Sequence, residues 1–92
     1  MTNGQIRELS NYISEKIPQF QEELSKLTKI SSTNYVICML VAVRFSTSEI
    51  ATLMCKTPQA INSARQRLYE KAFGDKGSPQ KWDNIIFSLS MR

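Results

Sequence analysis

Apolar residues recur at helical spacing in the first third of the chain. Between residues 5 and 28 they follow a seven-residue period with a second row interleaved, which predicts an amphipathic helical segment. The residues of this stripe are Ile6, Ile13, Ile17, Phe20, Leu24 and Leu27. Pro18 interrupts the stripe, because proline lacks a backbone N–H and disfavours helix at the residue before it. The segment is therefore either one kinked helix, or a helix ending near Ile17 followed by another with Pro18 in its first turn.

This stripe has two interpretations at the level of packing. It either packs against the rest of the same domain or forms the seam of a coiled coil or dimer. We expect internal packing, because a short run of heptads interrupted by a proline gives a seam little length. Residues 1–29 are thus predicted to be an N-terminal helical segment, serving as a linker or as a packing or dimerisation helix. A domain formed by residues 30–92 follows it.

A wholly apolar run occupies the middle of the chain. Residues 30–34, "ISSTN", are rich in helix N-capping residues, so a helix should start there. The following "YVICMLVAVRF", residues 35–45, is rich in β-branched side chains and would also suit a buried strand. The chain offers no second strand candidate, and a lone strand would leave its backbone unpaired. The run is therefore predicted to be a helix.

Two helix starts then follow in close succession. "STSE", Ser46 to Glu49, is a capping box in which each residue bonds the backbone amide of the other. Thr57 and Pro58 start the next helix as its N-cap and first helical residue. About three residues connect the first helix to the second, which predicts a helix-turn-helix, two helices set at a steep angle.

The second of these helices and a last helix each have one apolar face. On the second helix the apolar face is formed by Ala60, Ile61, Ala64 and Leu68. Gly74 should end this helix in a left-handed conformation. Ser78 and Pro79 repeat the cap-plus-proline start. The apolar stripe of the last helix consists of Trp82, Ile85, Ile86 and Leu89.

The charges are unevenly distributed along the chain. Residues 1–43 carry four basic and four acidic side chains, whereas residues 44–92 carry eight basic and four acidic ones. The whole net charge of +4 therefore lies in the second part. Such asymmetry indicates an anionic partner for that part, either nucleic acid or a membrane surface.

Several classes of function find no support in the residues. The chain has no histidine, no nucleophile beside a base, no glycine-rich phosphate loop and no cluster of metal ligands, so we expect no enzyme, cofactor or metal. Cys38 and Cys55 fit no zinc or redox spacing. The longest apolar run, residues 36–43, is far shorter than the roughly twenty residues of a membrane span, and no leader peptide is recognisable. We expect a reduced, cytoplasmic chain without a membrane partner.

The helix from residue 58 to 72 has side chains suited to double-stranded DNA. In a helix-turn-helix the second helix enters the major groove, where amides pair with adenine and serine donates or accepts. The predicted base contacts are Gln59, Asn62, Ser63 and Gln66. The predicted phosphate contacts are Ser46, Thr47, Lys56, Thr57, Arg65, Arg67 and Lys71. The rival hypothesis is a helical protein-interaction or dimerisation module without DNA binding.

The stretch "STSEIATLMCKTPQAINSARQRLYEK" resembles the DNA-binding domain of LuxR-type regulators and the related sigma-factor region that reads the promoter −35 element. The likeness rests on Ile50-Ala51, on the Thr57 cap and on Ile61 four positions later, and it covers about residues 30–74. "IPQF" at residues 17–20 and "KWDNII" at residues 81–86 are similar to regulators that join this domain to a tetratricopeptide-repeat sensor.

The resemblance implies an all-α bundle of four to five helices with a central helix-turn-helix, of the winged-helix-like LuxR effector class. It further implies sequence-specific DNA binding by residues 30–92 in transcriptional regulation, with homodimerisation through the last or the N-terminal helix and RNA polymerase as a further partner. Arg44 and Cys55 stand where LuxR-type domains usually have glycine. Either Cys55 takes a strained positive φ, or the turn differs from that of the family.

Overall fold

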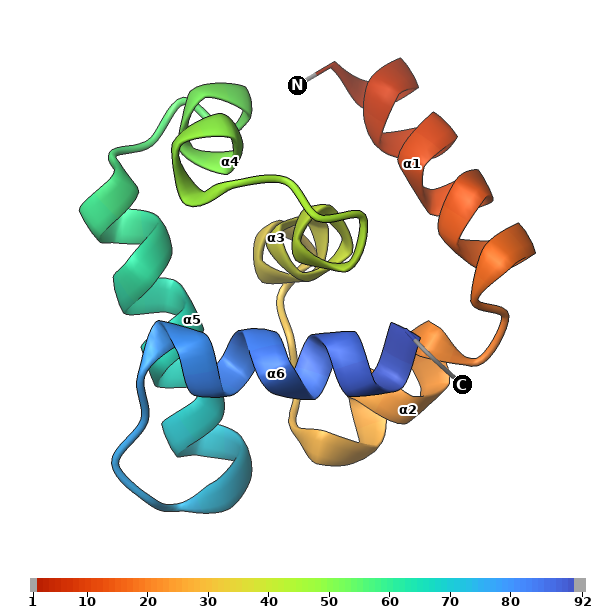
Figure 1. The fold of residues 1–92 in the computed structure, drawn as a ribbon. Coiled ribbons are helices and arrows are strands. Elements are labelled where there is room, and N and C mark those ends of the chain that lie inside the picture. Colours follow the sequence, from red (N-terminus) through yellow and green to blue (C-terminus); the bar gives the residue numbers. More distant parts are fainter. Residues whose placement is uncertain (1, 91–92) are drawn as a thin grey trace.

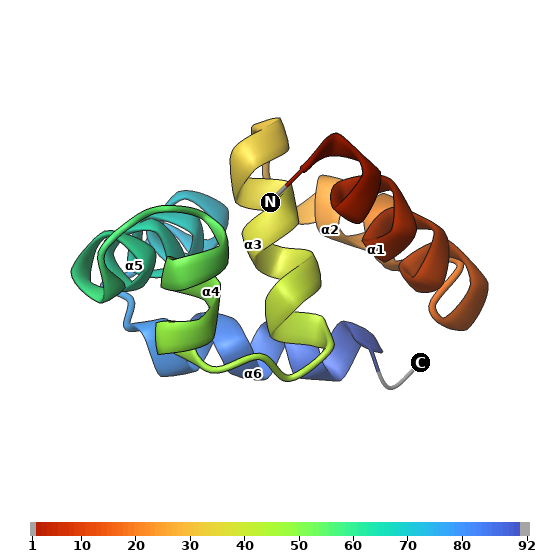
Figure 2. The same ribbon diagram turned by 90° about the horizontal axis from the view of Figure 1, so that it is seen from above.

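The helix α3 (Ser32–Ala42) is the central element of the fold in the computed structural model, which describes residues 2–90. The helices are α1 (Asn3–Lys16), α2 (Phe20–Leu27), α3 (Ser32–Ala42), α4 (Thr47–Leu53), α5 (Pro58–Phe73) and α6 (Pro79–Ser90). The other five surround α3 (Figures 1 and 2). Residues 2–90 contain no strand, so the predicted all-α class is confirmed for them. Every residue from Val36 to Ala42 is buried, which explains why the sequence of α3 lacks a polar face.

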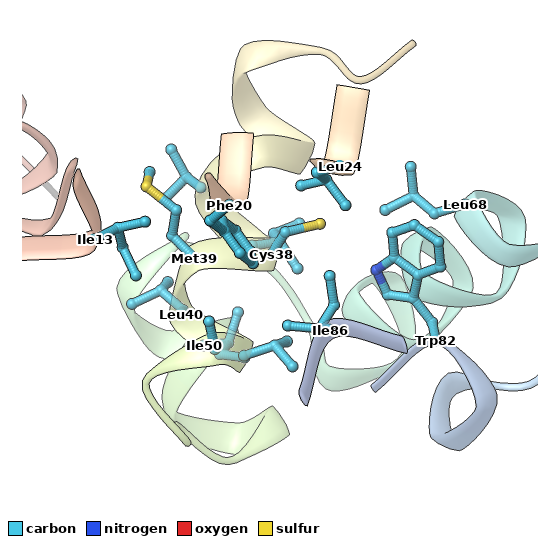
Figure 3. Packing of buried hydrophobic residues seen from close by; sticks show 14 of the residues in the cluster. Ile13, Phe20, Leu24, Cys38, Met39, Leu40, Ile50, Leu68, Trp82 and Ile86 are labelled. Atoms are coloured by element: carbon cyan, nitrogen blue, oxygen red, sulfur yellow. The ribbon is translucent and has the colours of Figure 1, made fainter. Parts of the chain in front are cut away.

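One apolar core joins all six helices of the described chain. Its members labelled in Figure 3 are Ile13, Phe20, Leu24, Cys38, Met39, Leu40, Ile50, Leu68, Trp82 and Ile86. Trp82 is the largest fully buried side chain, and its indole lies against the thiol of Cys38. Burial raises the pKa of the Cys38 thiol to about 12, because a thiolate there would be desolvated. Cys38 is therefore a neutral packing residue.

The N-terminal segment forms two helices rather than one kinked helix. α1 ends at Lys16, and Pro18 lies immediately before Gln19, the N-cap of α2, instead of in the first turn of that helix. The predicted count of four to five helices is therefore wrong, since residues 2–90 form six. The apolar stripe of this segment packs into the common core, as expected. The boundary placed after residue 29 consequently does not divide the core.

Hydroxyl caps start the helices where the sequence placed them. Ser31 Oγ accepts a hydrogen bond from the amide of Asn34 at 3.2 Å. Ser78 Oγ accepts one from the amide of Lys81 at 3.3 Å. Gly74 ends α5 with a φ of 73°, the left-handed conformation that glycine adopts without strain. These boundaries depend on local chemistry, which is why they were predictable.

α3 ends in a Schellman motif with arginine at the position usually occupied by glycine. The amide of Phe45 donates to the carbonyl of Leu40 at 3.1 Å, and Arg44 between them has a φ of 70°. The Arg44 guanidinium carbon lies 3.7 Å from the centre of the Phe87 ring. This cation–π contact holds the turn against α6 and offsets part of the backbone strain.

Candidate functional site

The capping box at the start of α4 is formed as predicted. Ser46 Oγ accepts from the amide of Glu49 at 3.2 Å, and Glu49 Oε1 accepts from the amide of Ser46 at 2.9 Å. The hydrogen bonds from Ser46 hold the pKa of the Glu49 carboxyl below its usual value, because they stabilise its ionised form. The box fixes where α4 begins and thus how it supports the next helix.

α4 also ends in a Schellman motif, which forms the turn between α4 and α5. The amide of Lys56 donates to the carbonyl of Ala51 at 2.9 Å, and Cys55 has a φ of 56°. Cys55 therefore takes the strained left-handed conformation, and the alternative of a different turn is not needed. Thr57 Oγ1 then accepts from the amide of Ala60 at 3.1 Å and starts α5. The two helices are steeply inclined to each other (Figures 1 and 2).

One side of α5 is held in the core, and its extent differs from the predicted apolar face. Ile61 and Leu68 are buried, and Ala64 is half-buried. Ala60 is exposed, so its assignment to the attached face is wrong. Arg65, which is only 5% exposed, belongs to the inner side of α5 instead.

Arg65 is the buried centre of a polar cluster that joins three helices. Its Nη1 donates to Asp83 Oδ2 of α6 at 2.6 Å, and its Nη2 donates to Thr47 Oγ1 of α4 at 2.7 Å. Nη2 also donates to Asn62 Oδ1, one turn earlier on α5. The side chain of Asp83 is 22% exposed, so the ion pair is largely shielded from water. Arg65 is therefore a structural residue, and its prediction as a phosphate contact is corrected.

The cluster also engages two other predicted contacts. Thr47 and Asn62 both accept hydrogen bonds from Arg65, which fixes the side-chain oxygen that each would offer to DNA. Gln66 is half-buried, and its Nε2 lies 3.4 Å from Glu70 Oε2. These three residues are held by neighbours rather than presented freely on the surface.

The remaining predicted contacts are exposed. Among the described residues, no hydrogen-bond or ionic partner is recorded for the side chains of Gln59, Ser63, Lys56 or Arg67. The exposed residues among the predicted contacts are Ser46, Lys56, Thr57, Gln59, Ser63, Arg67 and Lys71. The hydroxyls of Ser46 and Thr57 accept backbone amides yet keep a proton to donate. The arrangement presents amide, hydroxyl and cationic groups along the outward side of α5.

Sequence reasoning missed two acidic residues that shape this surface. Asp83 pairs with Arg65 across 18 residues, and no local pattern announces such a contact. Glu70 accepts from the amide of Gly77 at 3.3 Å and thereby fixes the loop after α5. Its position four residues after Gln66 is a helical spacing that favours side-chain contact, and this signal was readable.

Comparisons with protein families, with curated proteins and with solved structures found no match. The described helices include none whose length and apolar character would let it cross a bilayer. Within residues 2–90, no three histidine, cysteine, aspartate or glutamate side chains gather in a way that would hold a metal ion. Cys38 and Cys55 are both free thiols.

Proposed function

We propose that this chain binds double-stranded DNA sequence-specifically through α5 and acts as a transcriptional regulator of the LuxR-like helix-turn-helix type. The observation that carries the proposal is the outward side of α5. It exposes Gln59, Ser63 and Arg67 without recorded partners, while the opposite side is anchored in the core. A helix anchored on one side and polar on the other is what insertion into the major groove requires.

The α4–turn–α5 unit supports the assignment as a helix-turn-helix. Four residues, 54–57, separate α4 from α5. Arg44 and Cys55 are the non-glycine residues with positive φ in the described chain. LuxR-type domains usually have glycine at both positions, so the backbone conformation here agrees with the resemblance even where the residue type departs from it.

The Arg65 cluster supports the proposal by giving α5 a fixed orientation. A reading helix must hold its side chains at a defined position, because base readout depends on hydrogen-bond geometry. Arg65 ties α5 to Thr47 of α4 and to Asp83 of α6. Gln59 and Ser63 are the best placed base contacts, and Lys56, Arg67 and Lys71 supply charge for phosphates.

A salt titration of binding to duplex DNA tests the proposal. Contacts to several phosphates release counterions, so the logarithm of affinity should fall by about 0.9 per contact for each decade of salt. Replacing Lys56 and Arg67 together by glutamine should make the slope of log affinity against log salt less steep, by the contribution of about two phosphate contacts. Absence of binding at low salt, or a slope unaffected by the double substitution, would refute DNA binding by α5.

The second candidate is a protein-interaction module, favoured by an apolar hollow on α4. Phe45 is 40% exposed and lines this hollow together with Leu53. In a regulator, such a surface suits contact with RNA polymerase.

Homodimerisation remains a further proposal, for which α6 would have to use its polar outer face, because Trp82, Ile86 and Leu89 are buried in the protein's own core. We further propose a cytoplasmic location, where a transcriptional regulator would have access to DNA.

A further inference from the structure

A groove runs between the N-terminal turn of α3 and the flank of α5. Two adjoining hollows share Asn34, Ala64 and Arg67 in their walls, so together they form one continuous depression. One end is bordered by Lys29 and Lys71, whose Nζ lies 3.4 Å from the Lys29 carbonyl oxygen. We call this depression the α3–α5 groove.

The α3–α5 groove is lined by positive charge alone. Its charged lining residues are Lys29, Lys56, Arg67 and Lys71, and no aspartate or glutamate contributes to the wall of either hollow. By contrast, Lys26 on neighbouring α2 lies 4.0 Å from Glu22 and 3.7 Å from Glu23. Four cations around one depression without an acidic neighbour in its wall create a local positive potential, which an anionic ligand would relieve.

The groove also offers uncharged donors and an apolar floor. Thr33 lies in the first turn of α3 and lines the groove, and its backbone amide has no acceptor among the described residues. Ile37 and Leu68 form apolar parts of the lining. Cations, a free backbone amide and apolar carbon in one depression match the chemistry of a sugar–phosphate chain, whose phosphates need donors and whose sugars contact apolar surface.

The position of the groove beside α5 favours a DNA strand over a free anion as its ligand. Ser63 and Arg67 belong both to the outward side of α5 and to the groove wall. When the outward side of α5 faces base edges, the flanking groove must face one strand of the same duplex. A free anion would not need this continuity, whereas a DNA strand would follow it.

We infer that the α3–α5 groove holds the sugar–phosphate backbone of one DNA strand, with Lys29 and the first turn of α3 as phosphate contacts. This inference rests on the proposed DNA binding and extends it to a second element. The sequence pattern assigned no DNA contact to Lys29 or to α3. The contact surface is thus wider than the α4–α5 unit, and it includes the junction with the N-terminal segment.

The test compares two lysines that are three residues apart. In the full chain, Lys29→Gln should lower the slope of log affinity against log salt by about 0.9, for preferred and random duplexes alike. Lys26→Gln is the matched control, since Lys26 has acidic neighbours and lines neither hollow. Both side chains are exposed, so thermal unfolding should confirm that both variants fold. The glutamine keeps the backbone carbonyl that Lys71 contacts.

A second variant tests the α3 wall of the groove without removing a cation. Thr33→Glu places a carboxylate in the groove wall and should weaken duplex binding at least tenfold, because it repels the phosphates. If Lys29→Gln and Thr33→Glu bind like the wild type while Arg67→Gln has a lower slope, the groove inference is overturned and DNA binding by α5 stands. If the wild type binds a polyglutamate peptide through Lys29 but no duplex at low salt, both proposals are overturned.

Discussion

Arg65 and Arg67 lie two residues apart on α5 and have opposite environments. Arg65 is 5% exposed and donates to Asp83, Thr47 and Asn62. Arg67 is exposed, has no recorded partner among the described residues, and lines the α3–α5 groove. The two guanidinium groups point to different sides of the helix because two residues correspond to a rotation of about 200°.

The difference shows that basic composition alone does not define a binding surface. A buried cation that already has a carboxylate partner contributes to folding, and its charge is neutralised before any ligand arrives. A cation without a partner keeps its field for an anion in solution. On α5 these two roles are divided between the face toward α6, centred on Arg65, and the face toward α3, centred on Arg67.

The largest expected effect is the loss of stability in Arg65→Ala. Removing one partner of a buried pair leaves Asp83 without its main counterion and Thr47 without its donor. The free energy of unfolding should fall by about 3 kcal/mol. Urea denaturation of the two proteins measures it. Arg67→Ala is the matched control and should change stability by no more than about 0.5 kcal/mol.

A double-mutant cycle separates the pair from the surrounding packing. Arg65→Met together with Asp83→Leu should cost less than Arg65→Met alone, because the double variant leaves no unpaired buried charge. Equal destabilisation by Arg65→Ala and Arg67→Ala would contradict the division between the two faces.

The next effect concerns the specificity of DNA binding by the exposed face. Gln59→Ala should reduce the difference in binding free energy between preferred and random duplexes by about 1–3 kcal/mol, since an amide that pairs with a base is lost. Asn62→Ala should affect stability more than specificity, because Asn62 accepts from Arg65. Binding to duplexes selected from random DNA measures both. The reverse result, with Asn62 controlling preference and Gln59 having no influence, would show that the Arg65 side reads the bases.

A smaller effect is expected for Arg67→Gln. Loss of one phosphate contact should weaken binding by about 1 kcal/mol at moderate salt, for all sequences equally. Fluorescence anisotropy with labelled duplexes measures this loss, and Lys81→Gln on α6 serves as the control for net charge. A loss of the same size in both variants would mean that only the total charge matters.

The smallest effect is expected at Cys55, in the turn that orients α5. Cys55→Gly should raise stability by about 0.5 kcal/mol, because relief of the left-handed strain exceeds the extra freedom of glycine in the unfolded chain. DNA binding should stay unchanged, because the turn keeps its conformation. Thermal denaturation measures the gain, and a lower stability of the variant would show that the Cys55 side chain makes a favourable contact.

Local features of the fold could be predicted from the sequence. The caps at Ser31, Ser46 and Thr57, and the end of α5 at Gly74, follow from hydrogen bonds between residues a few positions apart. The prediction that α3 is a helix was also correct, because the sequence offers no second strand with which it could pair. Pro18 correctly indicated the break between two helices, but it did not show that the second helix begins after the proline and not at it.

The candidate site was less predictable, because it depends on contacts between distant segments. Arg65 and Arg67 are chemically the same, and the carboxylate that Arg65 pairs with, Asp83, comes from the distant helix α6. Helical periodicity places Arg65 within 40° of Ile61, which was a readable sign that it faces inward. The contribution of Lys29 to the groove depends on how the fold places the start of α3 beside α5, which no local pattern encodes.

Amide chemical-shift mapping by NMR, with duplex DNA titrated into the isotope-labelled chain, tests the central claim most directly. The largest shifts are expected at Gln59, Ser63 and Arg67, with smaller ones around Lys29 and little change on the outer side of α1. Shifts confined to α1 or to the hollow around Phe45, with α5 unaffected, would contradict DNA binding by α5.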